Sequence, residues 1–124
     1  MIKRKEVVKV LELAELAAGA KSRLIDCKTL DLDKVSALTI TIRCTHHPSA
    51  TKAVLVHVLS AVDEMTFDSV DYATFEAHLL AGAESQKTVA ITPDILLLKI
   101  QLENQDTSYA AADLDVWATL GYEE

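Results

Sequence analysis

The sequence has few of the residues that break regular structure and few that cross-link small proteins. Its 124 residues include only three glycines, two prolines and two cysteines. So little glycine and proline excludes a low-complexity, disordered chain. Cys27 and Cys44 lack the C-x-x-C spacing of common metal sites, and two cysteines alone are weak support for a disulfide. Both lie beside expected strands, where a free cysteine behaves as a small hydrophobic residue, so we expect buried free thiols.

Aromatic residues and long hydrophobic runs are also scarce. Aromatic side chains make up 5% of a chain that is 50% hydrophobic, so its core is expected to be mainly aliphatic. No apolar run approaches the roughly 18 residues of a membrane-spanning helix. Glu6, Lys9 and Glu12 interrupt the segment after the basic start, so we expect no secretory signal. Lys3, Arg4 and Lys5 are expected to form a flexible, solvated tip.

Basic residues are fewer than acidic ones, and the formal net charge is −7. Affinity for nucleic acid comes largely from cations that neutralise phosphates, so a surface of this sign repels DNA and RNA. We therefore expect no nucleic acid among the partners. The lack of a membrane-length apolar run predicts no membrane partner, and the lack of binding motifs predicts no cofactor.

The dominant pattern is alternation between apolar and polar residues. Residues 98–103 and 112–118 both place apolar side chains at even positions, and a polar turn at 104–108 separates them. A period of two directs alternate side chains to opposite faces of a sheet, so each segment predicts a strand with one buried and one wet face. The predicted core comprises Leu38, Ile40, Ile42, Leu98, Ile100, Leu102, Leu114 and Val116.

Further strands are expected along the chain, with turn signals every 8 to 15 residues. They cover residues 22–27, 36–44, 53–62, 72–80 and 86–91. Residues 53–62 are apolar on both faces apart from His57 and Ser60, which favours a central strand. Residues 29–34 are expected to be a polar connection and residues 63–71 an acidic loop.

The N-terminal segment, residues 1–20, is the most ambiguous part. Residues 6–18 carry a helical apolar stripe and good helix formers, but they can also be read as a strand. We favour a strand or arm, because tertiary context overrides propensity. About eight short strands then predict an all-β fold over residues 1–124, a single antiparallel, jelly-roll-like β-sandwich.

Candidate chemical groups lack the spacing that known sites require. The four histidines show no H-E-x-x-H pattern, and His57 and His78 have no evident third ligand. We interpret them as loop and sheet-face residues. The acidic loop could supply calcium with carboxylates, but the ordered calcium-loop pattern is absent and a solvated loop is favoured. These carboxylates are Asp63, Glu64, Asp68 and Asp71. No nucleophile elbow or phosphate loop occurs, so we expect a protein that is not an enzyme.

Three aromatic residues are candidate interface residues: Trp117, Tyr109 and Tyr72. Trp117 shares its parity with Asp113 and Asp115, which places it on the wetter face or at an interface, where tryptophan is enriched. On an exposed face the same aromatic residues would suit a carbohydrate- or receptor-binding adhesin module, and this alternative stays open.

Several short segments together resemble a known class of protein. They are Ile25-Asp26, residues 35–42, Ser60 to Asp63, Phe75-Glu76 before Ala81-Gly82, Gln86 to Val89, Leu98 to Asp106, and Val116 to Ala118. Between Leu24 and Leu120 the chain resembles small β-sandwich proteins in the virions of tailed bacteriophages. The resemblance implies a non-enzymatic virion component of capsid, neck or tail, assembled in the host cytoplasm. It implies a homo-oligomer that packs against other virion proteins, and an exposed strand edge could add a neighbour's strand.

Overall fold

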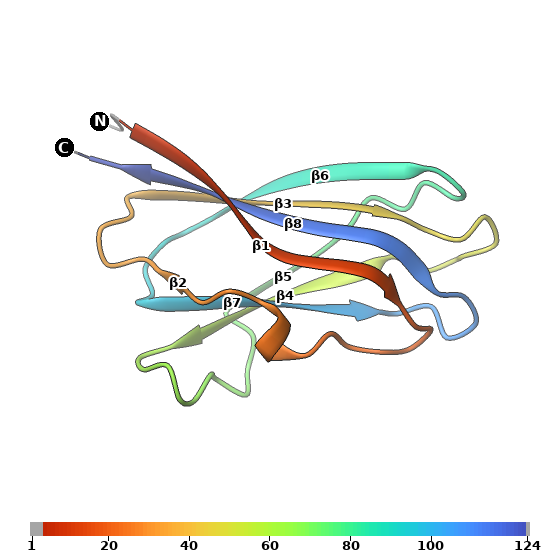
Figure 1. The fold of residues 1–124 in the computed structure, drawn as a ribbon, viewed down its shortest axis with the longest axis horizontal. Helices are drawn as coiled ribbons and strands as arrows, with labels where there is room; N and C mark the ends of the chain where they lie inside the picture. The colour runs from red at the N-terminus through yellow and green to blue at the C-terminus, as the bar shows by residue number, and fades with distance from the viewer. Residues whose placement is uncertain (1–3, 124) are drawn as a thin grey trace.

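Two four-stranded sheets face each other in the computed structural model, which describes residues 4–123 (Figure 1). Sheet A has the strand order β1 (Arg4–Leu16), β8 (Ala111–Tyr122), β3 (Ala37–Thr45) and β6 (Glu84–Ile91). Sheet B has the order β2 (Leu30–Asp31), β7 (Leu97–Asn104), β4 (Val54–Ala61) and β5 (Ala73–Glu76). Neighbouring strands in both sheets are antiparallel.

The pairing of the strands defines the topology. β1 pairs with β8, β2 with β7, β3 with β6 and β4 with β5. These are the pairs of one long hairpin, with arms β1–β4 and β5–β8, that has been wrapped into two sheets. Eight strands in this arrangement form a jelly roll, which confirms the predicted fold class.

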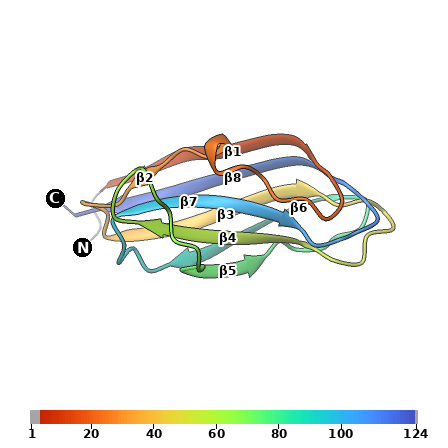
Figure 2. The ribbon, with the colours of Figure 1, turned by 90° about the horizontal axis from the view of Figure 1, so that it is seen from below.

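The connections lie at two opposite ends of the sandwich (Figures 1 and 2). The β1–β2, β3–β4, β5–β6 and β7–β8 connections share the end on the right of Figure 1, which we call the loop end. Both termini and the β4–β5 loop lie toward the other end. No helix within residues 4–123 is long and apolar enough to cross a membrane.

The core fills the space between the sheets and agrees with the sequence pattern. All eight predicted core residues are buried. Cys27 and Cys44 are free and buried in the same apolar cluster. The Cys27 Sγ accepts the Ile100 N–H at 3.2 Å, and burial raises the pKa of Cys44 to about 11. Both cysteines therefore pack as residues of the hydrophobic core.

The N-terminal segment forms a strand, as predicted, and this strand, β1, pairs with β8 over nearly its whole length. The flexible tip expected at residues 3–5 is wrong for Arg4 and Lys5, which belong to β1. The Arg4 guanidinium lies 4.3 Å from the centre of the Tyr122 ring. Lys3 lies outside the described residues.

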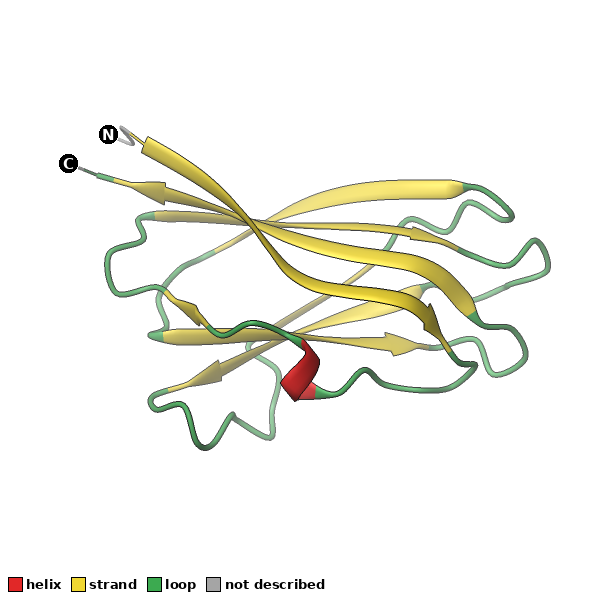
Figure 3. Ribbon diagram, viewed as in Figure 1, coloured by secondary structure: helices red, strands yellow, loops and turns green. Residues whose placement is uncertain are grey.

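Three segments differ from expectation in the kind or sheet of the structure they form (Figure 3). The strand expected at residues 22–27 is wrong: Leu24–Asp26 form the short 3-10 helix η1, which the Asp26 N–H closes onto the Arg23 carbonyl at 3.1 Å. The strand expected at 72–80 ends at Glu76, where the chain leaves sheet B for sheet A. The connection expected at 29–34 contains the two-residue β2, which pairs with β7.

Candidate functional site

The outer face of sheet A carries Trp117 at its centre. From Leu114 to Leu120 the even-numbered side chains of β8 are buried and the odd-numbered ones are partly exposed, so Trp117 points outward, as its parity predicts. Its neighbours across the strands are Lys9 in β1 and Thr41 in β3. The face is rich in threonine, and Thr41 and Thr88 share a hydrogen bond of 2.7 Å between their hydroxyls. The result is a polar sheet surface around the Trp117 ring.

Two cations cover the Trp117 ring. The Arg43 guanidinium lies 4.6 Å from the ring and the Lys9 ammonium lies 5.4 Å away, both within range of a cation–π interaction. Lys9 also pairs with Asp115 at 3.0 Å and with Glu12. Hydrogen bonds to Glu12 and Asp115 raise the pKa of Lys9. The ring is therefore held in a charged network on the surface.

Tyr109 lies at the loop end and stacks on His47, with ring centroids 4.1 Å apart. The Asp106 carboxylate organises this loop by accepting backbone N–H groups of Thr51, Ser108 and Tyr109 at 2.9 Å. These bonds lower the pKa of Asp106 to about 2. Tyr109 is thus presented on a loop with a fixed backbone.

Tyr72 has a structural role in the sheet. Its hydroxyl bonds the carbonyl and the hydroxyl of Thr92, each at 2.8 Å, and so ties the start of β5 to the connection after β6. Trp117, Tyr109 and Tyr72 therefore lie on different elements with different partners. None of the described ring contacts joins any two of them.

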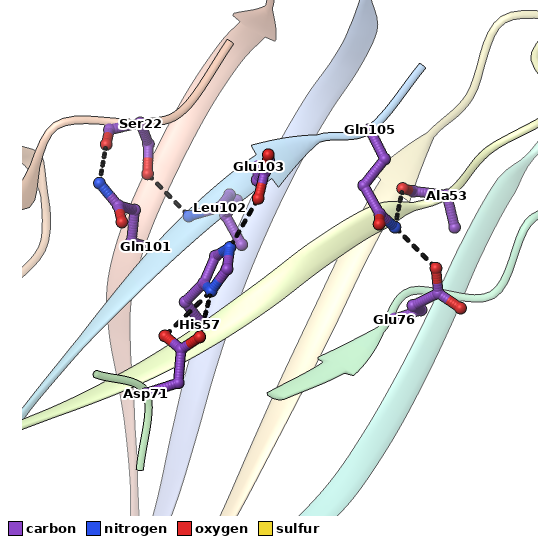
Figure 4. A network of polar contacts seen from close by, with 9 residues as sticks. All are labelled: Ser22, Ala53, His57, Asp71, Glu76, Gln101, Leu102, Glu103 and Gln105. Carbon is purple, nitrogen blue, oxygen red and sulfur yellow. Dashed lines mark hydrogen bonds and ion pairs between the residues drawn. The ribbon is translucent and has the colours of Figure 1, made fainter. Parts of the chain in front are cut away.

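A histidine between two carboxylates lies on the outer face of sheet B (Figure 4). His57 of β4 places Nδ1 3.0 Å from both Asp71 carboxylate oxygens, and Nε2 2.9 Å from Glu103 Oε1. Each ring nitrogen therefore has a carboxylate oxygen within hydrogen-bond distance. The triad, which we call the His57 clasp, joins the end of the β4–β5 loop to β4 and β7.

An open groove of about 580 Å³ lies near the loop end. Gln105 crosses it and donates from Nε2 to the Ala53 carbonyl at 2.9 Å and to Glu76 at 2.6 Å (Figure 4). The Lys87 ammonium donates to the Glu76 carbonyl at 3.0 Å. The polar groups of the groove thus tie the end of β5 to β6 and to Gln105, which directly follows β7.

The carboxylates of the acidic loop do not form a cluster that could bind a metal ion. Asp63 accepts the N–H groups of Met65 and Thr66, while Asp71 belongs to the His57 clasp. Within the described part of the chain, no group of three or more His, Cys, Asp or Glu is placed to hold a metal ion.

Sequence reasoning missed the His57 clasp. The one available signal was the position of His57, which is the only titratable residue in the otherwise apolar strand predicted at residues 53–62. The partners Asp71 and Glu103 are 14 and 46 residues away, so only the topology brings them together.

No protein-family model matches the sequence, and no curated protein matches it. Solved structures share its fold. The PRD1 vertex protein P5 has a TM-score of 0.51 at 14% identity, covering 97% of this chain and 95% of that one. A chain of the T13 IBDV viral particle has a TM-score of 0.52 at 12% identity, over 97% of this chain but only 32% of that one. A chain from Bacillus endospore appendages, described as disulfide-linked pili, reaches only 0.43 at 11% identity, covering 99% and 95%.

Proposed function

We propose that the chain is a non-enzymatic structural component of a virus particle that acts by packing against other proteins. The observation that carries this proposal is the jelly roll shared with the PRD1 vertex protein over 97% of the chain. The fold of a chain in the T13 IBDV particle supports the same assignment. In its finer form, suggested by the sequence resemblance, the protein is a capsid decoration, neck or tail component of a tailed phage. It would assemble in the host cytoplasm.

The strand edges favour packing through faces rather than strand addition. β2 and β5 are short, with two and four residues. β6 carries Lys87, whose ammonium is held on the Glu76 carbonyl, and β1 has an irregular register at Lys9–Leu11 where the Lys28 N–H bonds Val10. Short, charged and bulged edges resist the addition of another strand. We therefore propose that the faces of the sandwich and its loops, with Trp117 and Tyr109, make the contacts in the particle.

The surroundings of Trp117 favour this role over a carbohydrate-binding adhesin. A sugar that stacks on an indole needs a free ring face, whereas Arg43 and Lys9 lie 4.6 and 5.4 Å from this ring. A glycan array tests the alternative directly. Specific glycan binding that Trp117→Ala abolishes would favour the adhesin.

The test of the proposed function is the location of the protein. Particles from cells that produce the chain are purified on a density gradient and analysed by mass spectrometry and immunogold electron microscopy. We expect the chain to co-purify with particles at a fixed stoichiometry and to label their surface at repeated positions. Recovery only in the particle-free fractions would overturn the proposal.

A further inference from the structure

The four most exposed large apolar side chains in the described part of the chain lie on two segments beside sheet B. Ile25 is 79% exposed, Val62 84%, Met65 90% and Val70 78%. Ile25 belongs to η1 in the β1–β2 connection, and the other three belong to the β4–β5 loop, residues 62–72. Large apolar side chains this exposed on two segments of one side of the molecule are candidates for an interaction surface.

The β4–β5 loop presents its apolar side chains on a fixed backbone. The Asp68 N–H bonds the Ser60 carbonyl at 2.8 Å, Asp63 accepts two N–H groups of its own turn, and the His57 clasp holds Asp71. A loop that is already ordered loses little conformational entropy when it binds. Met65 is therefore exposed on a loop whose backbone is already ordered by hydrogen bonds.

Lys99 joins the two segments. Its ammonium donates to the Leu24 carbonyl at 3.0 Å and lies 5.4 Å from the centre of the Phe67 ring. Lys99 projects from the outer face of β7, so η1 and the β4–β5 loop lie on either side of it. The lower part of Figure 1 shows η1 and this loop below sheet B.

The two segments carry opposite charge. Residues 62–71 contain four carboxylates and no lysine or arginine. Residues 21–28 contain Lys21, Arg23 and Lys28 against the single Asp26. Lys21 lies opposite Glu103 in an antiparallel bridge, and therefore shares the outer face of sheet B with it.

We propose that this surface is a two-fold contact between two copies of the chain. In a two-fold contact the same patch meets itself, so an element away from the axis faces a different element of the other copy. An acidic segment beside a basic one satisfies this requirement: the acidic loop of each copy meets the basic segment of its partner. The exposed apolar side chains on these same two segments would be buried in the contact. The inference deepens the proposed function, since it names the surface through which the chain self-associates.

Charge reversal on each segment provides the test. Lys21→Glu/Arg23→Glu makes both segments acidic, and Glu64→Lys/Asp68→Lys places two lysines in the loop and brings its net charge from −4 to zero. Sedimentation at micromolar concentration should show a wild-type species of about twice the 13.5 kDa chain mass. We expect each double variant to weaken self-association at least tenfold. An equimolar mixture of the two variants should form a heterodimer. The acidic loop of the first variant then meets the basic segment of the second, and the new lysines of the second meet the new glutamates of the first.

The controls separate this surface from others. Lys34→Glu/Lys52→Glu makes the same change of charge in other loops, and Val7→Ser removes an exposed apolar side chain from sheet A. Both should leave the dimer intact, while Met65→Ser should weaken it at least tenfold. Thermal melts verify that each variant folds.

Three outcomes would overturn the proposal: a wild-type monomer throughout the concentration range, a dimer unaffected by both double variants, or a variant mixture that stays monomeric. An unaffected dimer would place self-association on another surface and leave the proposed function standing. Co-purification with particles is measured separately, so its failure is distinguishable from failure of the dimer contact.

Discussion

Two buried polar side chains determine the backbone of the loop end. The Asn104 amide donates to the carbonyls of Leu16 and Tyr109 at 3.2 and 2.9 Å. Asp106 accepts N–H groups from its own loop and from Thr51 in the β3–β4 connection. Such side chains replace the backbone partners that loop residues lack in a sheet. They fix the relative positions of three connections, those before β2, β4 and β8.

Asp106 should give the fold a distinct acid sensitivity. Its pKa in the folded protein is about 2, below the ordinary value of 3.8, because the carboxylate accepts backbone N–H groups. A carboxyl group with a lowered folded pKa contributes stability that is complete above about pH 4 and is lost as the pH falls toward 2.

Asp106→Asn tests this contribution, because asparagine still accepts hydrogen bonds but does not titrate. In thermal melts we expect the wild type to exceed the variant in melting temperature above pH 4. The difference should shrink as the pH falls from 4 to 2. A difference that stays constant over this range would contradict the assignment.

Ile100 tests the core. Its side chain is fully buried between the sheets, so Ile100→Ala removes contacts that the surrounding structure cannot fully replace. Large-to-small changes at such sites cost about 2–5 kcal/mol. Urea unfolding should show a loss in this range, and the matched exposed variant Val7→Ala should change stability by less than about 0.5 kcal/mol.

At the scale of elements, long-range pairing decides conformations that local preference leaves open. Residues 4–16 contain good helix formers, yet they form a strand because β8 offers a partner along their length. The β4–β5 loop has a similar dependence: its end is fixed by the His57 clasp, which draws on β4 and β7. Local order in both segments therefore follows from distant residues.

His57→Leu should release the end of the β4–β5 loop while the sheets persist. The change removes both ring nitrogens that contact the carboxylates but keeps similar volume. Hydrogen bonds to charged groups contribute about 1.5–3 kcal/mol, and the loss should be about 1–2 kcal/mol because both carboxylates are one-third exposed.

Amide hydrogen exchange measures the local effect of this variant. Exchange should quicken at Asp68 and Tyr72, whose N–H groups bond to β4. His78→Gln is the matched control outside the clasp and should leave these amides unchanged. Unaltered protection in His57→Leu would show that the clasp does not hold the loop.

At the scale of the whole molecule, one core joins the two sheets. Cys44 belongs to β3 of sheet A, while Cys27 packs against β7 of sheet B through its bond to the Ile100 N–H. Both belong to one buried cluster, so neither should become accessible while the sheets remain packed.

Thiol labelling therefore reports global unfolding. Burial raises the pKa of both thiols, so each is protonated as well as inaccessible in the native state. We expect a thiol reagent at pH 8 to modify neither cysteine in the native protein, and both over the same denaturant range. Labelling of one cysteine well before the other would show that the sheets separate in steps.

The sequence by itself determined which residues face inward. Alternation is a local property of a strand, so it identified the core and the outward position of Trp117. It also indicated a polar break between residues 98–103 and 112–118. It could not determine pairing: β7 and β8 are consecutive, yet they lie in different sheets. Strand partners depend on how all eight strands bury their apolar faces together, which no local pattern contains.

The proposed contact surface and the His57 clasp divide in the same way between sequence and structure. The acidic loop and the basic residues at 21–28 are visible in the sequence, whereas their position on either side of Lys99 is not. The same holds for the His57 clasp, whose three members come from β4, β7 and the β4–β5 loop. Charge and hydropathy are properties of each residue, but the tertiary structure decides which residues meet, because only the packed sheets place distant segments side by side.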